Sequence, residues 1–114
     1  FKEGSFKKYI NRIRRIYRRK YDFALKAAGR YIPHAEITGE GGFYIFAVLG
    51  GVNSRELLKR CIKKGAAFMP GDIFYTDGKG FDTMRLGFAK INFEDMEKGF
   101  KIIGEEIKNM KGNS

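Results

Sequence analysis

The sequence predicts an α+β fold in which a small, mostly antiparallel sheet packs against helices and a long helix stands at the N-terminus. Three observations support this fold class. Apolar residues recur every three or four positions over residues 5–29, short aromatic-rich runs are separated by glycine turns, and two asparagines directly precede helical patterns. The expected order is helix, two strands, helix, two strands, helix, an order typical of helices layered on one antiparallel sheet.

The first helix is expected over residues 5–29 and ends at Gly29, which is a favourable residue after a helix C-terminus. Its single apolar stripe consists of Phe6, Ile10, Ile13, Tyr17, Ala24 and Ala28. This three- and four-residue spacing predicts that one face packs against the rest of the domain.

Two further helices are predicted from their caps. Asn53 can accept a hydrogen bond at the start of a helix, and Glu56 stands where a capping box needs it. Asn92 is expected to cap the last helix in the same way. The predicted buried face of the first of these helices is Leu57, Leu58, Cys61 and Ile62, and that of the second is Phe93, Met96, Phe100, Ile103, Ile107 and Met110.

Four strands are predicted from apolar and aromatic runs. The first two cover residues 35–38 and 42–49 and are joined by a glycine turn at residues 39–42. The second strand is apolar almost throughout, which favours a central position in the sheet. The other two strands are expected over residues 66–69 and 83–89.

Composition places the chain among globular proteins. It has 114 residues, of which 43% are hydrophobic and 15% aromatic, enough for one domain with a real core. The single cysteine excludes a disulfide framework and favours a reducing compartment, so a cytoplasmic location is expected. No apolar run approaches the roughly 20 residues of a membrane span, and no signal-peptide pattern is visible. Because the chain starts at Phe1, we expect it to be a piece of a longer protein.

The net charge of +10 is concentrated in the first helix. Residues 1–30 hold 11 of the 23 lysines and arginines but only 2 of the 13 acidic residues. We interpret these cations as the solvated face of the helix. A self-contained basic module that binds nucleic acid is the remoter alternative, and it would have to rest on this one helix.

Arg85 is the strongest candidate for a binding residue. It interrupts a segment with a strand pattern, and a charged side chain in a half-buried strand is costly unless it is compensated. The planar guanidinium matches a carboxylate with two parallel hydrogen bonds, so Arg85 is a candidate anion clamp. The structural alternative is an ion pair with a nearby acid, either Asp72 or Asp82.

Other chemical motifs have plainer explanations. The aromatic run at residues 43–46 lacks the glycines of an RNA-recognition motif, so we assign it to core packing. The glycines at 39–42 precede no helix start and indicate a hairpin turn. His34 is predicted to be a loop residue, and Cys61 to be buried and inert. No metal site is expected.

Four segments, in order, resemble the C-terminal small domain of fold-type I pyridoxal-phosphate-dependent aminotransferases. The family pattern there is a Gly-Gly-x-Phe strand, an apolar strand ending in Pro-Gly-x-x-Phe, an Arg-Leu-x-Phe strand and a closing helix. The matching segments are residues 11–19, 40–46, 65–74 and 84–89. The resemblance covers nearly the whole chain. It implies an interdomain-type basic helix over residues 1–30 and the small domain proper over residues 31–114, as one structural unit.

The resemblance implies that Arg85 binds the α-carboxylate of the substrate. Pro70 and Gly71 would shape the loop beside it, and Phe74 would line the site or its edge. The family's Schiff-base lysine, its aspartate for the pyridine nitrogen and its phosphate cup belong to the large domain. No catalytic residue is therefore expected in this chain, and no pyridoxal phosphate is expected on it alone. The full-length protein is expected to hold that cofactor.

The partners implied by the resemblance are an amino-acid or 2-oxo-acid substrate or effector, the large domain of the same chain, and a second subunit in a homodimer. Two branches of the family remain open. One is the free-standing aminotransferases of the 2-aminoadipate or aromatic type. The other is the MocR regulators, in which such a module follows a winged-helix domain of the GntR class that alone would bind DNA. Residues 86–89 and the arginine-rich first helix favour the regulators, whereas Arg85 fits both.

Overall fold

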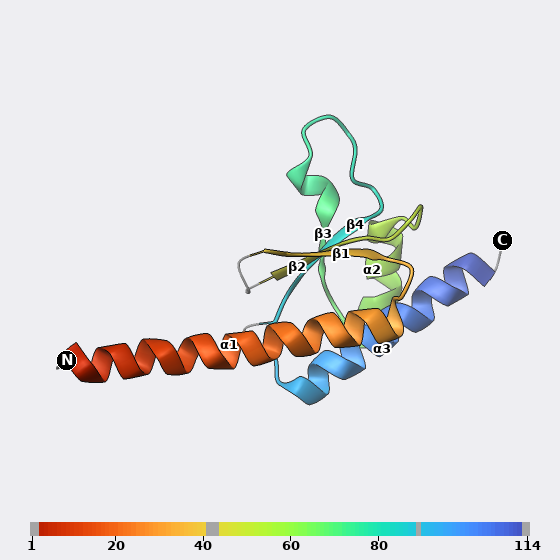
Figure 1. The fold of residues 1–114 in the computed structure, drawn as a ribbon. Helices are drawn as coiled ribbons and strands as arrows, with labels where there is room; N and C mark the ends of the chain where they lie inside the picture. Colours follow the sequence, from red (N-terminus) through yellow and green to blue (C-terminus); the bar gives the residue numbers. More distant parts are fainter. Residues whose placement is uncertain (1–2, 41–43, 89, 113–114) are drawn as a thin grey trace.

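The computed structural model describes residues 3–40, 44–88 and 90–112. The elements are α1 (Glu3–Tyr31), β1 (Glu36–Glu40), β2 (Tyr44–Val48), α2 (Ser54–Lys63), β3 (Met69–Pro70), the short 3-10 helix η1 (Gly71–Phe74), β4 (Thr83–Gly87) and α3 (Phe93–Gly112). This order confirms the predicted α+β class, with helices against one small sheet and a long helix at the N-terminus (Figure 1).

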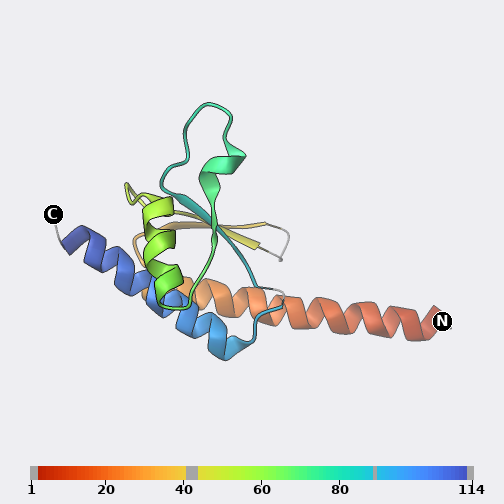
Figure 2. The same cartoon turned by 180° about the vertical axis from the view of Figure 1, so that it is seen from behind.

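The sheet is antiparallel throughout, with the strand order β1-β2-β4-β3, so β2 is central as predicted. Because side chains alternate along a strand, its two faces differ sharply. Ile45 and Ala47 of β2 and Met84 of β4 are fully buried and pack toward the helices. We call the other face, which carries Tyr44 and Arg85, the open face. Figure 2 shows the helices gathered on one side of the sheet.

Small residues set the crossing of α1 and α3. Ala24, Ala27 and Ala28 of α1 are buried in the core. On α3, a Cβ atom at Gly104 would lie 2.3 Å from the carbonyl oxygen of Tyr31. The two helices therefore approach each other closely at a point where one of them has no side chain.

A buried carboxylate joins α2 to α3. Glu106 is 3% exposed, lies 3.2 Å from Lys64 Nζ and accepts a hydrogen bond from Asn109 Nδ2 at 3.0 Å. The contact with Lys64 lowers the pKa of Glu106, so the carboxylate stays ionised. The neighbouring Cys61 is buried, as predicted, and burial followed by the charge of Glu106 raises its pKa to about 11. The thiol is therefore protonated at neutral pH.

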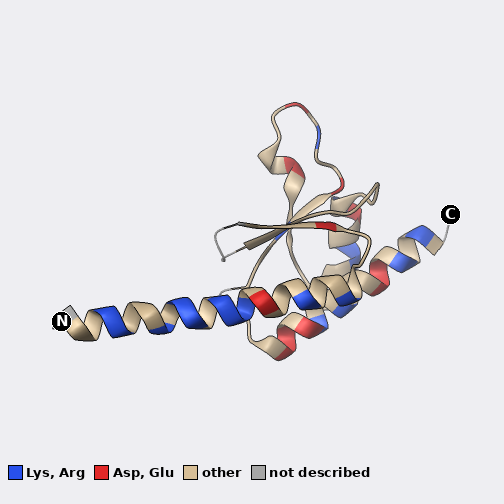
Figure 3. Ribbon diagram, in the orientation of Figure 1, with Lys and Arg blue, Asp and Glu red and all other residues tan. Residues whose placement is uncertain are grey.

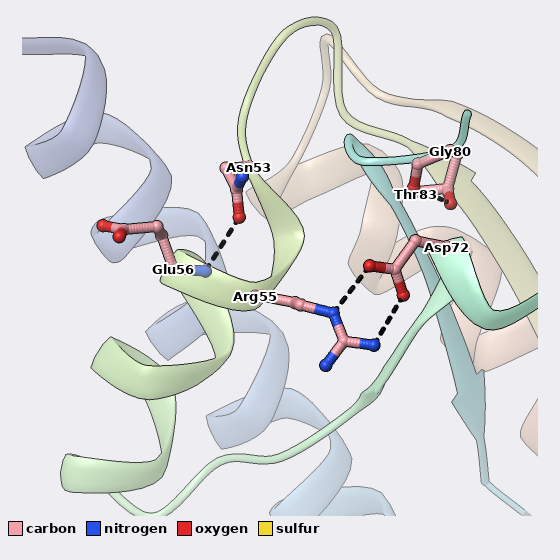
Figure 4. A network of polar contacts seen from close by, with 6 residues as sticks. All are labelled: Asn53, Arg55, Glu56, Asp72, Gly80 and Thr83. Atoms are coloured by element: carbon pink, nitrogen blue, oxygen red, sulfur yellow. Dashed lines mark hydrogen bonds and ion pairs between the residues drawn. The ribbon is translucent and has the colours of Figure 1, made fainter. Parts of the chain in front are cut away.

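Both predicted asparagine caps are confirmed. Asn53 Oδ1 accepts from the backbone N–H of Glu56 at 3.0 Å (Figure 4). Asn92 Oδ1 accepts from the backbone N–H of Asp95 at 2.8 Å. Gly65, which follows α2, has a φ of +94°, a conformation that favours glycine. These local signals place the starts of α2 and α3 correctly.

Helix α1 extends well beyond the sheet, and it contributes to a longest molecular dimension of 60 Å (Figure 1). Only its C-terminal part is buried, whereas Phe6, Tyr9 and Ile16 in its first half are exposed. Eight of the ten lysines and arginines of the helix lie between Lys7 and Lys20, and Figure 3 shows them along the projecting part and the middle of the helix. Although α1 is the longest element, no described helix is long and apolar enough to cross a membrane.

The predicted buried face of α2 was wrong at one residue. Leu57 and Cys61 are fully buried, but Ile62 is 58% exposed. The helical spacing placed Ile62 next to the apolar stripe, and the neighbouring elements α3 and β3 cover only the Leu57–Cys61 side.

The predicted strand boundaries needed correction as well. The strand expected over residues 66–69 is only Met69–Pro70, an edge position that suits a proline, which lacks a backbone N–H. The turn out of β3 is therefore made by η1. Gly39 and Glu40, expected in a turn, belong to β1. The last strand ends at Gly87, and residues 41–43 and 89 lie outside the described part of the chain.

The crossing of α1 and α3 yields a testable pair of substitutions. Gly104→Ala forces a methyl group against the Tyr31 backbone and is expected to destabilise the domain by about 1–3 kcal/mol. Gly99→Ala, on the same helix with nothing within 4 Å of the added atom, should leave stability unchanged or raise it by up to about 1 kcal/mol. Urea unfolding measures both, and equal effects would contradict this account of the crossing.

Candidate functional site

Arg85 lies in the middle of β4 on the open face of the sheet. Its cross-strand neighbours are Phe46 on β2 and Met69 on β3, and Phe46 is itself opposite Thr38 on β1. The arginine thus belongs to a row that crosses all four strands. Its side chain is half-buried, so it is partly removed from water yet still accessible.

Two aromatic rings flank the guanidinium. Arg85 Cζ lies 3.7 Å from the centroid of the Tyr44 ring and 5.1 Å from that of Phe74. Both distances fall within the range of cation–π attraction, and the shorter one corresponds to direct stacking. The rings come from opposite sides of β4, because Tyr44 belongs to β2 and Phe74 to η1, which follows β3.

Two hollows meet at Arg85. One has a volume of about 350 Å³ and is lined by Phe46, Phe74, Tyr75 and Arg85. The other, of about 580 Å³, is lined by Tyr44, Ala67, Phe68, Met69, Pro70, Arg85 and Gly87. The arginine is the charged residue in both linings, and the rest is mostly apolar. Such walls strengthen the attraction between the guanidinium and a bound anion.

The three site-shaping residues predicted from the sequence lie near Arg85. Pro70 pairs with Met84, next to Arg85 in β4, and Phe74 is one of the two flanking rings. Gly71 is buried, and a Cβ atom there would lie 2.0 Å from Thr83 Oγ1 and 3.0 Å from the Thr83 backbone. A larger residue at this position would push η1, and Phe74 with it, away from β4.

An ion pair ties η1 to α2. Arg55 donates from Nε to Asp72 Oδ2 at 2.6 Å and from Nη2 to Asp72 Oδ1 at 2.9 Å (Figure 4). These hydrogen bonds lower the pKa of Asp72. At the end of the loop between η1 and β4, the Thr83 hydroxyl donates a hydrogen bond to the Gly80 carbonyl oxygen at 2.7 Å.

The two acids that the sequence analysis weighed as partners of Arg85 have structural roles of their own. Asp72 uses both carboxylate oxygens for Arg55, and Asp82 Oδ2 accepts from the backbone N–H of Gly51 at 3.0 Å. The first interaction connects η1 to α2, and the second connects the loop between η1 and β4 to the segment that leads into α2.

An exposed apolar surface surrounds this loop. Its large side chains are Met69, Ile73, Phe74, Tyr75 and Phe81. A soluble monomer rarely exposes so many apolar side chains in one region, and a surface of this kind marks a site of contact. The loop projects from the side of the sheet away from α1 and α3 (Figures 1 and 2).

Sequence reasoning missed two residues of the site. Tyr44 was assigned to core packing with the aromatic run, but it is 39% exposed and lies on the open face, whereas its neighbour Ile45 is in the core. Arg55 was not singled out. Its position in the first turn of a helix gives no sign of a partner, and only the distant Asp72 shows what Arg55 binds.

The fold matches solved structures closely. The α-aminoadipate aminotransferase of Thermus thermophilus, solved in complex with N-(5'-phosphopyridoxyl)-L-leucine, superposes with a TM-score of 0.88 and 31% identity over 99% of this chain and 30% of that one. The kynurenine aminotransferase of Pyrococcus horikoshii gives a TM-score of 0.85 and 35% identity over 94% of this chain and 27% of that one. The chain is a small domain of the fold-type I aminotransferase family.

The relatives found by sequence comparison include both enzymes and regulators. It is 34% identical over 110 residues to an uncharacterized aminotransferase of Saccharolobus solfataricus, covering 94% of the chain and 27% of the relative. It is 32% identical over 103 residues to an uncharacterized HTH-type transcriptional regulator of Bacillus subtilis, covering 88% of the chain and 22% of the relative. No protein-family model matches the chain. The small domain spans about a quarter of the length of these relatives.

The Arg55–Asp72 pair predicts a pH dependence of stability. Because the folded pKa of Asp72 lies below its ordinary value of 3.8, the pair stabilises the fold above that pH and loses its effect as the pH falls through the lower folded pKa. The urea midpoint of Arg55→Gln should therefore lie below that of the parent at pH 7, and the difference should shrink below pH 3.8.

The matched control is Lys98→Gln, which removes an exposed pair with Glu94 at 3.3 Å on α3. Exposed pairs of this kind contribute little, so the control should follow the parent at every pH. A constant difference between Arg55→Gln and the parent across the whole pH range would contradict the role of Asp72.

Proposed function

We propose that this small domain binds the α-carboxylate of an amino acid or 2-oxo acid through Arg85, as part of a pyridoxal-phosphate-dependent aminotransferase-fold protein. The observation that carries the proposal is the guanidinium on the open face, 3.7 Å from the Tyr44 ring and at the junction of two apolar-walled hollows. Pro70, Gly71 and Phe74 shape the wall beside it.

The physical role of Arg85 is to position the ligand. A guanidinium held in a strand orients a carboxylate through two parallel hydrogen bonds, and this fixes where the α-carbon and its amine or oxo group lie. The complex of the Thermus relative contains leucine joined to the pyridoxyl group, which is a ligand of this class. It supports assigning an amino acid as ligand of the whole protein.

The cofactor belongs to the rest of the intact protein in this proposal. Pyridoxal phosphate supplies the electron sink that stabilises negative charge at the α-carbon of an amino acid. Arg85 acts at the opposite end of the ligand, where the two hollows around it are lined mostly by apolar and aromatic residues. No residue of this chain is therefore assigned to holding the cofactor or to catalysis.

The domain organisation follows from the same proposal. Residues 1–30 form the interdomain-type helix and residues 31–114 the small domain proper. A large domain and a second subunit would pack on two surfaces. One is the projecting half of α1, and the other is η1 with the exposed loop that follows it. We propose a homodimer in the cytoplasm, which fits the single, buried cysteine.

Two kinds of full-length protein are compatible with this small domain. The basic α1 and residues 86–89 favour a MocR-type regulator, and the relatives include both regulators and aminotransferases. The activity of the intact protein distinguishes these two kinds. An enzyme converts an amino acid and a 2-oxo acid to the exchanged pair, whereas a regulator carries a winged-helix domain and changes its affinity for DNA when the amino acid binds.

The carboxylate assignment is tested by an absorbance titration of the full-length, cofactor-loaded protein. Arg85→Gln should weaken amino-acid binding at least about a hundredfold, because a charged bidentate contact is lost. An amine that lacks only the carboxyl group should bind the parent and the variant equally weakly. The control Arg19→Gln, on the exposed face of α1, should bind like the parent. Parent-like discrimination between acid and amine by Arg85→Gln would refute the clamp.

A further inference from the structure

We propose that Tyr44 is a positioning residue that holds the plane of the Arg85 guanidinium so that an incoming carboxylate meets its N–H edge. This inference deepens the proposed function and rests on it. It concerns a residue that does not need to touch the ligand: Tyr44 acts through the arginine.

The contact between the two side chains is close. Arg85 Cζ lies 3.7 Å from the centroid of the Tyr44 ring, which is the distance of two flat groups in van der Waals contact. Tyr44 belongs to the central strand β2, which is hydrogen-bonded on both sides, so its backbone is held firmly. Phe74, at 5.1 Å, belongs to η1, is 48% exposed and lies farther from the guanidinium.

A glycine makes room for this stack. Tyr44 is the cross-strand partner of Gly87, two residues after Arg85 in β4. A Cβ atom built on Gly87 would already contact Tyr44 Cε1 at 3.4 Å and Cδ1 at 3.5 Å. A β-carbon at 87 would therefore just touch the ring, and side-chain atoms beyond it would compete with the ring for the space beside Arg85.

The chemistry of the contact differs from that of the other arginine near the site. Asp72 occupies the N–H edge of Arg55 and its negative charge compensates the guanidinium. Tyr44 instead covers a face of Arg85, and an aromatic face neither carries a net charge nor uses the in-plane N–H groups. Stacking thus orients the guanidinium without itself using the in-plane N–H donors or cancelling the positive charge.

The energetic benefit comes from orientation. A free arginine side chain has about 2 kcal/mol of rotamer entropy, part of which is lost when it grips a ligand. Stacking on Tyr44 restricts the guanidinium before the ligand arrives, so less entropy is lost on binding. The same restriction determines the direction of approach, because the face stacked on Tyr44 is closed to a carboxylate.

The test uses the full-length, cofactor-loaded protein and two probes: an amino acid and the amine that lacks its carboxyl group. Tyr44→Leu should raise the dissociation constant of the amino acid about 5- to 30-fold, as expected for a partly buried cation–π contact, and leave that of the amine unchanged. Tyr44→Phe, which keeps the ring, should stay within about twofold of the parent for both probes.

A second variant covers the case in which Tyr44→Leu does not fold. Gly87→Val keeps Tyr44 but fills the space across which its ring lies, so it should also weaken the amino acid and spare the amine. Parent-like amino-acid affinity in whichever of these two variants folds, together with a strong loss in Arg85→Gln, would overturn the role of Tyr44 and leave the clamp intact. If Arg85→Gln itself bound the amino acid as tightly as the parent does, the proposed function would be refuted, and the role of Tyr44 with it.

Discussion

The site depends on the two-sided nature of a single antiparallel sheet. Alternation along β2 and β4 buries Ile45 and Met84 under the helices and at the same time brings Tyr44 and Arg85 onto the opposite face. A guanidinium could not remain charged in the core without a buried counter-ion. The open face of a well-packed sheet supplies both partial burial and rigidity.

The loop beside this face is held by several small contacts. The Arg55–Asp72 fork joins η1 to α2, Gly71 lets η1 approach Thr83, and the Thr83 hydroxyl closes the far end of the loop. None of these residues binds a ligand in the proposed function. Together they determine where Phe74 lies and therefore how one side of the arginine is covered.

The binding residue could be predicted from the sequence, but its surroundings could not. An arginine within an apolar strand pattern is conspicuous because its desolvation is costly, and this makes Arg85 visible without coordinates. Tyr44 lies in a run of apolar and aromatic residues, in which alternation is hidden because both faces carry similar side chains. The stack also depends on register, since it requires the pairing that places Tyr44 opposite Gly87, two residues from Arg85.

Local sequence by itself determined the elements of this fold: the periodicity of α1 and α3, the caps Asn53 and Asn92, and the strand character of β2 and β4 are all encoded within a few residues. Tertiary structure alone decided which apolar residues are covered. Ile62 has the same pattern as its buried neighbours yet faces water, and β3 shrank to two residues at the sheet edge. The physical reason is that burial is a property of the packed neighbours, which distant parts of the chain provide.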